Sequence, residues 1–314
     1  MKTMTPVGAF VGGVGAVLKA PMVIIAAVLL TLLIALPFAA VLGSRVERSL
    51  ASQPPVSLNE TEIDPEWWQE FRAHARGLDA TFTPAIVGFA APLDSISAVL
   101  DGRRPALAIV GPILLSIAVW AFLWGGALRR YSAGRAIGWR AFIAAGLELW
   151  PRFIIISLAA MLAIVLLYLT LHALLFGPVY DFLASRTSSE RTAFFARVVL
   201  YAIFFAPVAM VGLVADYARI ASVVGSSNRL GDTIRAAITF MQHHFGVVTA
   251  LYLIVGAVFV LVTVGYGVLE IYGGSQVGGW RAIVLGQLYI VFRLAVRLNA
   301  DAASLRLFAA RSTP

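Results

Sequence analysis

Residues 216–245 read DYARIASVVGSSNRLGDTIRAAITFMQHHF and lie between two long apolar segments. The stretch begins with an acid and an arginine, Asp216 and Arg219, at the end of the first segment. It closes with a short amphipathic pattern that leads directly into the second segment. Weaker versions of this arrangement precede Phe153 and Ile24. The pattern predicts three copies of one unit: a helix on the inner membrane surface, an outward span, and a return span that ends in arginine.

The composition indicates a membrane protein. Sixty per cent of the 314 residues are hydrophobic and 13% are charged, which would leave large apolar patches on a soluble domain. Several apolar runs exceed the roughly 18 residues that distinguish a spanning helix from a buried one, and they lack the alternation of a β-barrel. We therefore predict an all-α integral membrane protein. Because the chain has no cysteine, disulfides and thiolate metal sites are excluded.

Six segments are predicted to span the membrane as three helical hairpins, each preceded by an amphipathic helix at the cytoplasmic face. They are residues 22–42, 106–128, 153–176, 194–214, 247–269 and 282 to about 298. A signal peptide cleaved near 39–44 is the alternative for the first segment. Its apolar stretch of about twenty residues is longer than the 7 to 15 of a signal core, which favours a retained span. The prediction is a single membrane domain over 1–314.

The distribution of lysine and arginine predicts the orientation. With the N-terminus inside, the inner segments hold 14 of these residues and the outer segments hold 10, six of which are diluted over a long loop that counts little. The sequence thus predicts a multi-pass protein of the bacterial inner (plasma) membrane with both termini in the cytoplasm. Arginines at the inner ends of the spans also explain the net charge of +8. The positive charge therefore does not require a nucleic-acid partner, and none is expected.

Residues 43–105 form an extracytoplasmic insertion between the first two spans and contain nine of the sixteen acids. The segment from Pro65 reads as a helix on which Trp67, Trp68 and Phe71 crowd one side. Indole rings are favoured at the membrane interface, so these three residues are predicted to anchor the helix there. The apolar segment 83–100 is broken by prolines and glycine and is predicted to be re-entrant or to lie on the surface.

Weak internal similarity supports the threefold unit. A shift of 95 residues places Arg140 on Arg235 and the expected helix breaker Pro151 on Gly246, and a shift of 130 places Pro21 on Pro151. Helical hairpins in parallel repeats build some transporters, which hold substrate near the repeat interface. Repeats also occur in membrane anchors that bind no substrate.

The inner segment GDTIRAAITFMQHHFGVVTALYL (231–253) and GQLYIVFRLAVRL (286–298) carry a family resemblance. They resemble the membrane domain of some bacterial glycerophosphodiester phosphodiesterases and several uncharacterised six-helix bacterial families. The resemblance covers about half of the chain and implies a six-helix membrane fold. Those phosphodiesterases carry their chemistry on a separate soluble barrel with metal-binding acids and histidines. This sequence shows no such barrel, so the resemblance implies no catalytic activity.

Arg293 and Gln287 are the sharpest polar outliers because they lie within a predicted span. An ionisable group there costs at least ~2.5 kcal/mol on insertion scales and usually pairs or faces a water-filled cavity. One hypothesis is a site for an anion or a lipid headgroup. The alternative is an arginine that extends to the inner interface.

Three further residues complete the binding candidates. Asp216 and Arg219 are three apart, so they can pair on one helix face, either as an interfacial ion pair or along a pathway. Glu270 at the outer end of the fifth span is a candidate for a cation or proton, or is solvated at the boundary. The sequence has no metal-binding or nucleophile motif, and we predict no catalytic residue, metal or cofactor.

Three function classes follow from these features. The first is a non-enzymatic scaffold or accessory subunit of the cell envelope that contacts membrane lipids and another membrane or cytoplasmic protein. The second is a transporter or permease component with a polar site between repeats. The third is a lipid-modifying membrane enzyme, which would need His172 or Glu270 within hydrogen-bond reach of another ionisable group. The permease predicts that Arg293 and Gln287 face a shared water-filled space, whereas the scaffold predicts a tightly packed centre.

Overall fold

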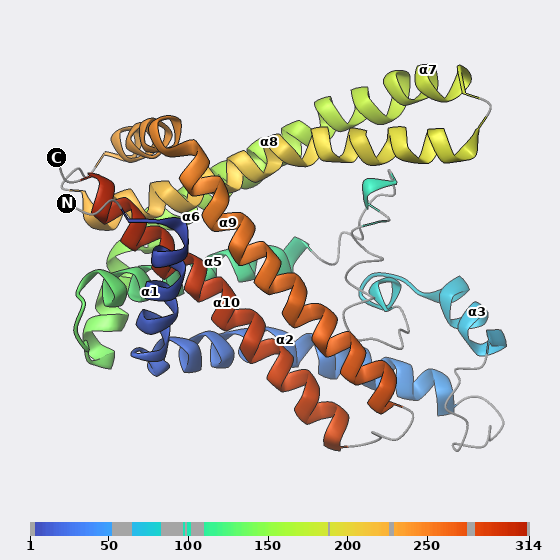
Figure 1. Cartoon of the computed structure of the whole chain (residues 1–314). Coiled ribbons are helices and arrows are strands. Elements are labelled where there is room, and N and C mark those ends of the chain that lie inside the picture. The colour runs from blue at the N-terminus through green and yellow to red at the C-terminus, as the bar shows by residue number, and fades with distance from the viewer. Residues whose placement is uncertain are drawn as a thin grey trace. The chain divides into compact units, whose positions relative to one another are not determined.

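The computed structural model describes residues 4–51, 65–82, 97, 99–101, 110–187, 189–225, 229–274 and 280–312. Within these ranges all regular structure is helical (Figure 1). The helices are α1 (Pro6–Leu18), α2 (Pro21–Ala51), α3 (Pro65–His74), α5 (Val110–Ser132), α6 (Trp139–Leu167), α7 (Tyr180–Ser185), α8 (Glu190–Val224), α9 (Leu230–Gly274) and α10 (Trp280–Ser312). A short 3₁₀ turn, η1 (Asp79–Thr81), and two π-helical turns, η3 (Tyr168–His172) and η4 (Leu175–Val179), complete them.

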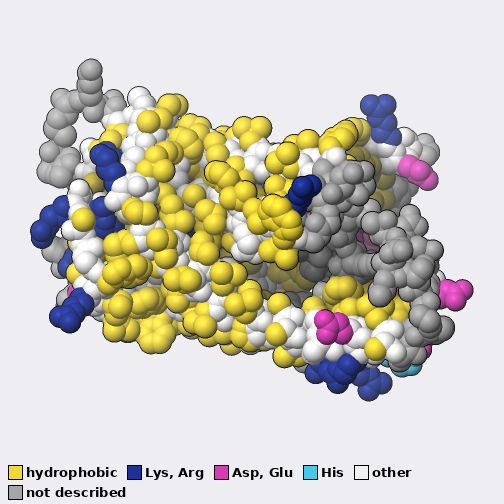
Figure 2. Space-filling view, turned by 90° about the horizontal axis from the view of Figure 1, so that it is seen from below, with side chains coloured by type: hydrophobic (Ala, Val, Ile, Leu, Met, Phe, Trp, Pro, Cys, Tyr) yellow, Lys and Arg dark blue, Asp and Glu magenta, His cyan; other side chains and the backbone are white. Residues whose placement is uncertain are grey.

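Six of the described helical segments are long and apolar enough to cross a membrane. Apart from residues 106–109, which lie outside the described residues, these segments contain the six predicted spans, which confirms an all-α multi-pass membrane protein. Much of their surface is apolar: Leu33, Leu162 and Leu253 are each more than half exposed. Hydrophobic side chains cover most of the face seen in Figure 2, as expected where lipid replaces water as the solvent.

The chain divides into two compact units. The first comprises Met1–Ala20, Ala121–Ile254 and Asn299–Pro314, and the second comprises Pro21–Trp120 and Val255–Leu298. In the first unit, α6, η3, η4 and α7 pair with α8 as a long helical hairpin (Figure 1). The second unit holds α2, α3 and the adjoining parts of α9 and α10. The segment predicted as re-entrant, 83–100, lies almost entirely outside the described residues.

Helix breaks differ from the sequence expectation. Pro151 was expected to separate an inner helix from the third span, but α6 stays helical through it. A membrane helix tolerates proline because neighbouring groups satisfy the freed carbonyl. Gly177 lies at a kink in η4, where its φ and ψ of −99° and −107° are not helical. In α9 a kink lies at His244, with φ −126° and ψ 23°.

The return helices are most buried at their C-terminal ends. Residues 216–222 of α8 are all buried, as are 298–305 of α10, although the second stretch lies mostly beyond the predicted sixth span. In α5 the same is true of 125–128, together with Arg130 and Tyr131. These stretches are rich in glycine and alanine, which let membrane helices approach closely. The core of the first unit is therefore built where the return helices end.

Helix α1 shows such an approach. Gly13 faces Asn299 and Ala303 of α10, and a Cβ at this glycine would collide with Asn299 Oδ1. A Cβ at Gly12 would lie 2.7 Å from Arg306 Nε. The Arg306 side chain can move away from Gly12, but the backbone nitrogen of Ala303 lies 3.0 Å from a Cβ at Gly13. Gly13 is thus required for α1 to reach α10 at this distance, whereas Val11 on the other side of α1 is 62% exposed.

Candidate functional site

An ion pair between Asp216 and Arg219 lies at the centre of the first unit. Arg219 Nη1 donates a hydrogen bond of 2.7 Å to Asp216 Oδ1. The two residues are only 8% and 6% exposed. The predicted pairing on one helix face is thus present, and its surroundings are the protein interior. Charges taken out of water at this depth are stable only if each has close partners.

Further hydrogen bonds extend from both members of the pair. The Tyr252 hydroxyl of α9 donates to Asp216 Oδ2 at 3.0 Å, and Ser304 Oγ of α10 donates to that hydroxyl at 3.4 Å. Arg219 Nη2 donates to Ser157 Oγ of α6 at 3.1 Å. Both oxygens of the Asp216 carboxylate and both terminal nitrogens of the arginine therefore have partners.

Trp124 of α5 connects the pair to a second acid. Its ring lies beneath the Arg219 guanidinium, with the Cζ atom 4.0 Å from the ring centroid. Its Nε1 donates to Asp301 Oδ2 on α10 at 3.1 Å. A desolvated cation over an indole gains about 2 kcal/mol, so the tryptophan holds the arginine as well as the second carboxylate. Asp301 itself is 5% exposed.

We call this set the polar network, and it consists of Trp124, Ser157, Asp216, Arg219, Tyr252, Asp301 and Ser304. Its members come from α5, α6, α8, α9 and α10, so it joins five helices of the first unit. Nearby, buried Arg130 of α5 donates from Nη2 to the Lys19 carbonyl at 2.8 Å and ties the end of α1 to the same region. In a low-dielectric interior these directional bonds fix helix register more tightly than apolar packing alone.

Arg293 and Gln287 lie elsewhere. Both are exposed on the part of α10 that belongs to the second unit, and Arg293 Cζ is 6.0 Å from the centroid of the neighbouring Tyr289 ring. The structure therefore does not bring these two residues into a buried site. Their exposure accords with the alternative in which the arginine extends along the helix surface.

Glu270 belongs to a small polar cluster between α9 and α10. The Tyr266 side chain hydrogen-bonds with Glu270, and the Tyr266 ring stacks on Tyr289 with centroids 4.3 Å apart. The Thr263 and Tyr289 hydroxyl oxygens are 3.3 Å apart. Glu270 is half-buried, so it is held by a tyrosine and is not simply solvated at the boundary.

The aromatic side chains of α3 pack on protein. Trp67 and Phe71 are 4% and 8% exposed, and their ring centroids are 5.3 Å apart. Trp67 Nε1 donates to Ser49 Oγ of α2 at 3.2 Å, while Trp68 is half-buried and stacks on Phe71. The sequence predicts all three at the membrane interface, but the structure directs Trp67 toward α2.

Replacing Trp67 with alanine is therefore expected to release α3 from α2. The variant loses the bond to Ser49 and most of the ring contacts, so the helix opens more often. We expect tryptic cleavage after Arg72 and Arg76 to become about tenfold faster. Trp68→Ala is the matched control because Trp68 lies on the same helix and is less buried. An equal acceleration in both variants would show that the Ser49 bond does not hold α3.

Sequence reasoning missed most of the polar network. Asp301, Ser304 and Asn299 follow the last predicted span. Their placement among alanines in NADAAS (299–304) could have indicated that they are buried. Small residues alternating with polar ones are typical of a buried helix contact in a membrane. Tyr252 and Trp124 gave no such signal, because tyrosine and tryptophan are ordinary residues near the ends of spans.

His172 lies among aromatic side chains. Its buried ring lies 4.6 Å from the ring centroids of both Tyr168 and Phe176, and Phe204 approaches edge-on. In the part of the chain that the structure describes, no three histidine or acidic residues gather to hold a metal ion. We compared the chain with protein-family models, curated proteins and solved structures, and none of them matches it.

Proposed function

We propose that the protein is a non-enzymatic scaffold or accessory subunit of the bacterial inner membrane, with both termini in the cytoplasm. The observation that carries this proposal is the polar network. Asp216 and Arg219 are paired with each other, Asp301 accepts a hydrogen bond from Trp124, and the members are bonded across five helices. Such a centre suits a rigid platform because it leaves the charges engaged with protein groups and not with a passing solute.

A partner surface is part of the proposal. The inner segments of α6 and α9 bury one side in the first unit and expose apolar residues on the other, including Trp139, Leu147 and Phe245. Arg140 and Arg235 are exposed on the same segments. Membrane lipids and another membrane or cytoplasmic protein are the partners we propose for these helices.

A threefold repeat is also proposed, and the positions of buried residues support it. Shifting α6 by 95 residues onto α9 superimposes buried residues on buried residues. The pairs are Phe142 with Ala237, Ala145 with Phe240, Gly146 with Met241, Phe153 with Val248, and Ile156 with Leu251. A shift of 130 does the same for Val23, Ala26 and Ala27 of α2 against Phe153, Ile156 and Ser157. Apolar sequences align by chance, but a shared pattern of burial reflects shared packing.

The return helices support the same repeat. Aligning their buried ends places Ala127 of α5, Ala218 of α8 and Ala303 of α10 at one position, and all three are fully buried. Asp216 and Asp301 then coincide as well. The shared burial at these positions supports the proposed threefold repeat.

The second candidate function is a transporter or permease component. The observation in its favour is the half-buried cluster of Thr263, Tyr266, Glu270 and Tyr289. Ionisable and hydroxyl groups within spans often line a substrate or proton pathway. Water access to the polar network separates this candidate from the scaffold.

The natural absence of cysteine makes that test direct. Ser304→Cys and Ser157→Cys introduce a thiol of similar size at two buried positions of the polar network. In inverted membrane vesicles, which expose the proposed cytoplasmic face, we expect a membrane-impermeant maleimide to label neither thiol, because the polar network is packed. Ser132→Cys, at an exposed position, is the labelled control. Labelling of Ser304→Cys at a rate within tenfold of that control would favour the permease and contradict the scaffold proposal.

A further inference from the structure

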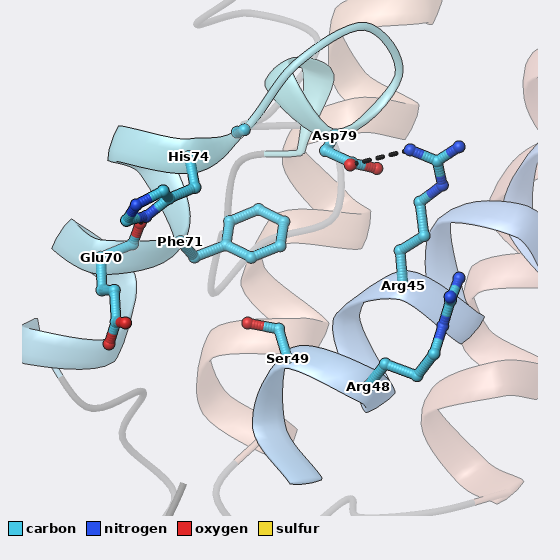
Figure 3. A pocket seen from close by; sticks show the side chains of 8 residues that line it. Arg45, Arg48, Ser49, Glu70, Phe71, His74 and Asp79 are labelled. Carbon is cyan, nitrogen blue, oxygen red and sulfur yellow. Dashed lines mark hydrogen bonds and ion pairs between the residues drawn. The ribbon is translucent and has the colours of Figure 1, made fainter. Parts of the chain in front are cut away.

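An open groove lies between the C-terminal end of α2 and α3 in the second unit (Figure 3). Its volume is about 600 Å³, and polar side chains form most of its surface. Arg45, Arg48 and Ser49 come from α2 on one side, and α3 with the following turn supplies the other side. The lining residues are Arg45, Arg48, Ser49, Glu70, Phe71, His74, Ala75 and Asp79.

Two arginines one helical turn apart dominate the α2 side. Arg45 Nη1 donates to Asp79 Oδ2 at 2.9 Å, yet the arginine side chain is still 45% exposed. Arg48 donates from Nε to the Ser44 carbonyl at 3.0 Å, a bond that does not use its two terminal nitrogens. Like charges at this spacing repel each other, so an anion between them would relieve the repulsion.

The α3 side offers a ring nitrogen and an apolar wall. His74 Nδ1 lies 2.9 Å from the Glu70 carbonyl, so when this nitrogen carries the proton its Nε2 is the atom left for a ligand. Phe71, buried and stacked on Trp67, presents carbon atoms between the polar groups (Figure 3). Two carboxylates also line the groove: Asp79 is bound to Arg45, and Glu70 belongs to α3. Arg48 also lines the groove, and its contacts within the described residues include no carboxylate.

The position of the groove along α2 indicates its ligand. The apolar run of α2 ends at Leu42, and Arg45 and Arg48 follow within two turns. At about 1.5 Å per residue they lie ~5 to 9 Å beyond that run, which is the depth of phospholipid headgroups. We propose that this groove binds the phosphate group of a phospholipid, with Arg48 as the principal ligand and Arg45 as the second. Guanidinium groups bind phosphate through paired hydrogen bonds, which suits them to this role.

The test uses the full chain purified in a phosphate-free maltoside detergent. The probe is a short-chain phosphatidylglycerol, and binding is measured by isothermal titration calorimetry. We expect Arg48→Gln to weaken binding about tenfold, the loss of one charge-assisted contact. Arg293→Gln removes an exposed arginine from α10 and should leave binding unchanged. Because Arg48 is exposed, its variant should fold, which thermal denaturation checks.

A second variant moves binding the other way. Asp79→Asn removes the carboxylate that competes for Arg45, so we expect a few-fold tighter binding of the same lipid. A merely structural role for the Arg45 to Asp79 pair would give weaker binding instead. Equal affinities of the wild type and Arg48→Gln would overturn the proposal, as would equal binding of a short-chain diacylglycerol that lacks phosphate. Displacement of the lipid by equimolar inorganic phosphate would assign the groove to the free anion and refute the lipid.

Discussion

Replacing Arg219 with methionine is expected to lower the free energy of unfolding by about 3–5 kcal/mol, the usual cost of breaking a buried ion pair. The substitution keeps the length of the side chain but leaves the Asp216 carboxylate without its cation. It also removes the group that rests on the Trp124 ring and the donor to Ser157. Unfolding by sodium dodecyl sulfate in mixed micelles measures the change, with tryptophan fluorescence as the signal.

Arg293→Met is the matched control for Arg219→Met. It makes the same chemical change at an exposed position of α10 and should alter stability by no more than about 0.5 kcal/mol. The double variant Asp216→Asn with Arg219→Met removes both charges. Its free energy of unfolding should be higher than that of Arg219→Met alone, because no uncompensated charge then remains at this site. Equal stability of the two single variants would mean that the pair does not hold the core together.

Hydropathy was sufficient to predict the spans. Twenty consecutive apolar residues have few stable arrangements other than a spanning helix. Each predicted span, as far as the structure describes it, lies inside a long helix. The lengths of those helices were not predictable in the same way. Pro151 was predicted to break the helix, but α6 continues through it. Whether a proline interrupts a helix depends on what satisfies the freed carbonyl, and that is decided by packing.

Only the local part of the polar network could be predicted. Asp216 and Arg219 are neighbours on any helix that contains them, so their pairing follows from spacing. Ser157 and Tyr252 reach the same pair from other helices, 62 and 36 residues away in sequence. No periodicity within a helix indicates which distant helix lies against it. The partners of a buried charge therefore remain hidden until the helices are placed.

The contrast between Arg293 and Asp301 has the same cause. The cost of placing a charge within a membrane span singles out Arg293 in the sequence. The structure leaves that residue exposed. Asp301 lies past the span and received no role from the sequence, yet it is 5% exposed and bonded to Trp124. Burial depends on the rotation of α10 and on how far it continues as a helix, and hydropathy reports neither.

Gly125→Val is the second substitution for which we expect a large loss of stability. A Cβ at Gly125 of α5 would lie 3.0 Å from the Ala145 carbonyl oxygen and 3.0 Å from the Gly146 Cα. Both are backbone atoms of α6, which cannot rotate away as a side chain can, so the two helices would have to separate.

Separation of α5 from α6 would also disturb Trp124, the residue next to Gly125, and through it the contacts with Arg219 and Asp301. We expect a loss of about 3 kcal/mol, measured by the same unfolding titration. Gly256→Val in α9 is the matched control, since a Cβ there meets no atom within 4 Å and the gain in side-chain bulk is identical. If both variants unfold at the same detergent fraction, the glycine is not needed for helix approach and α5 is held by its polar contacts alone.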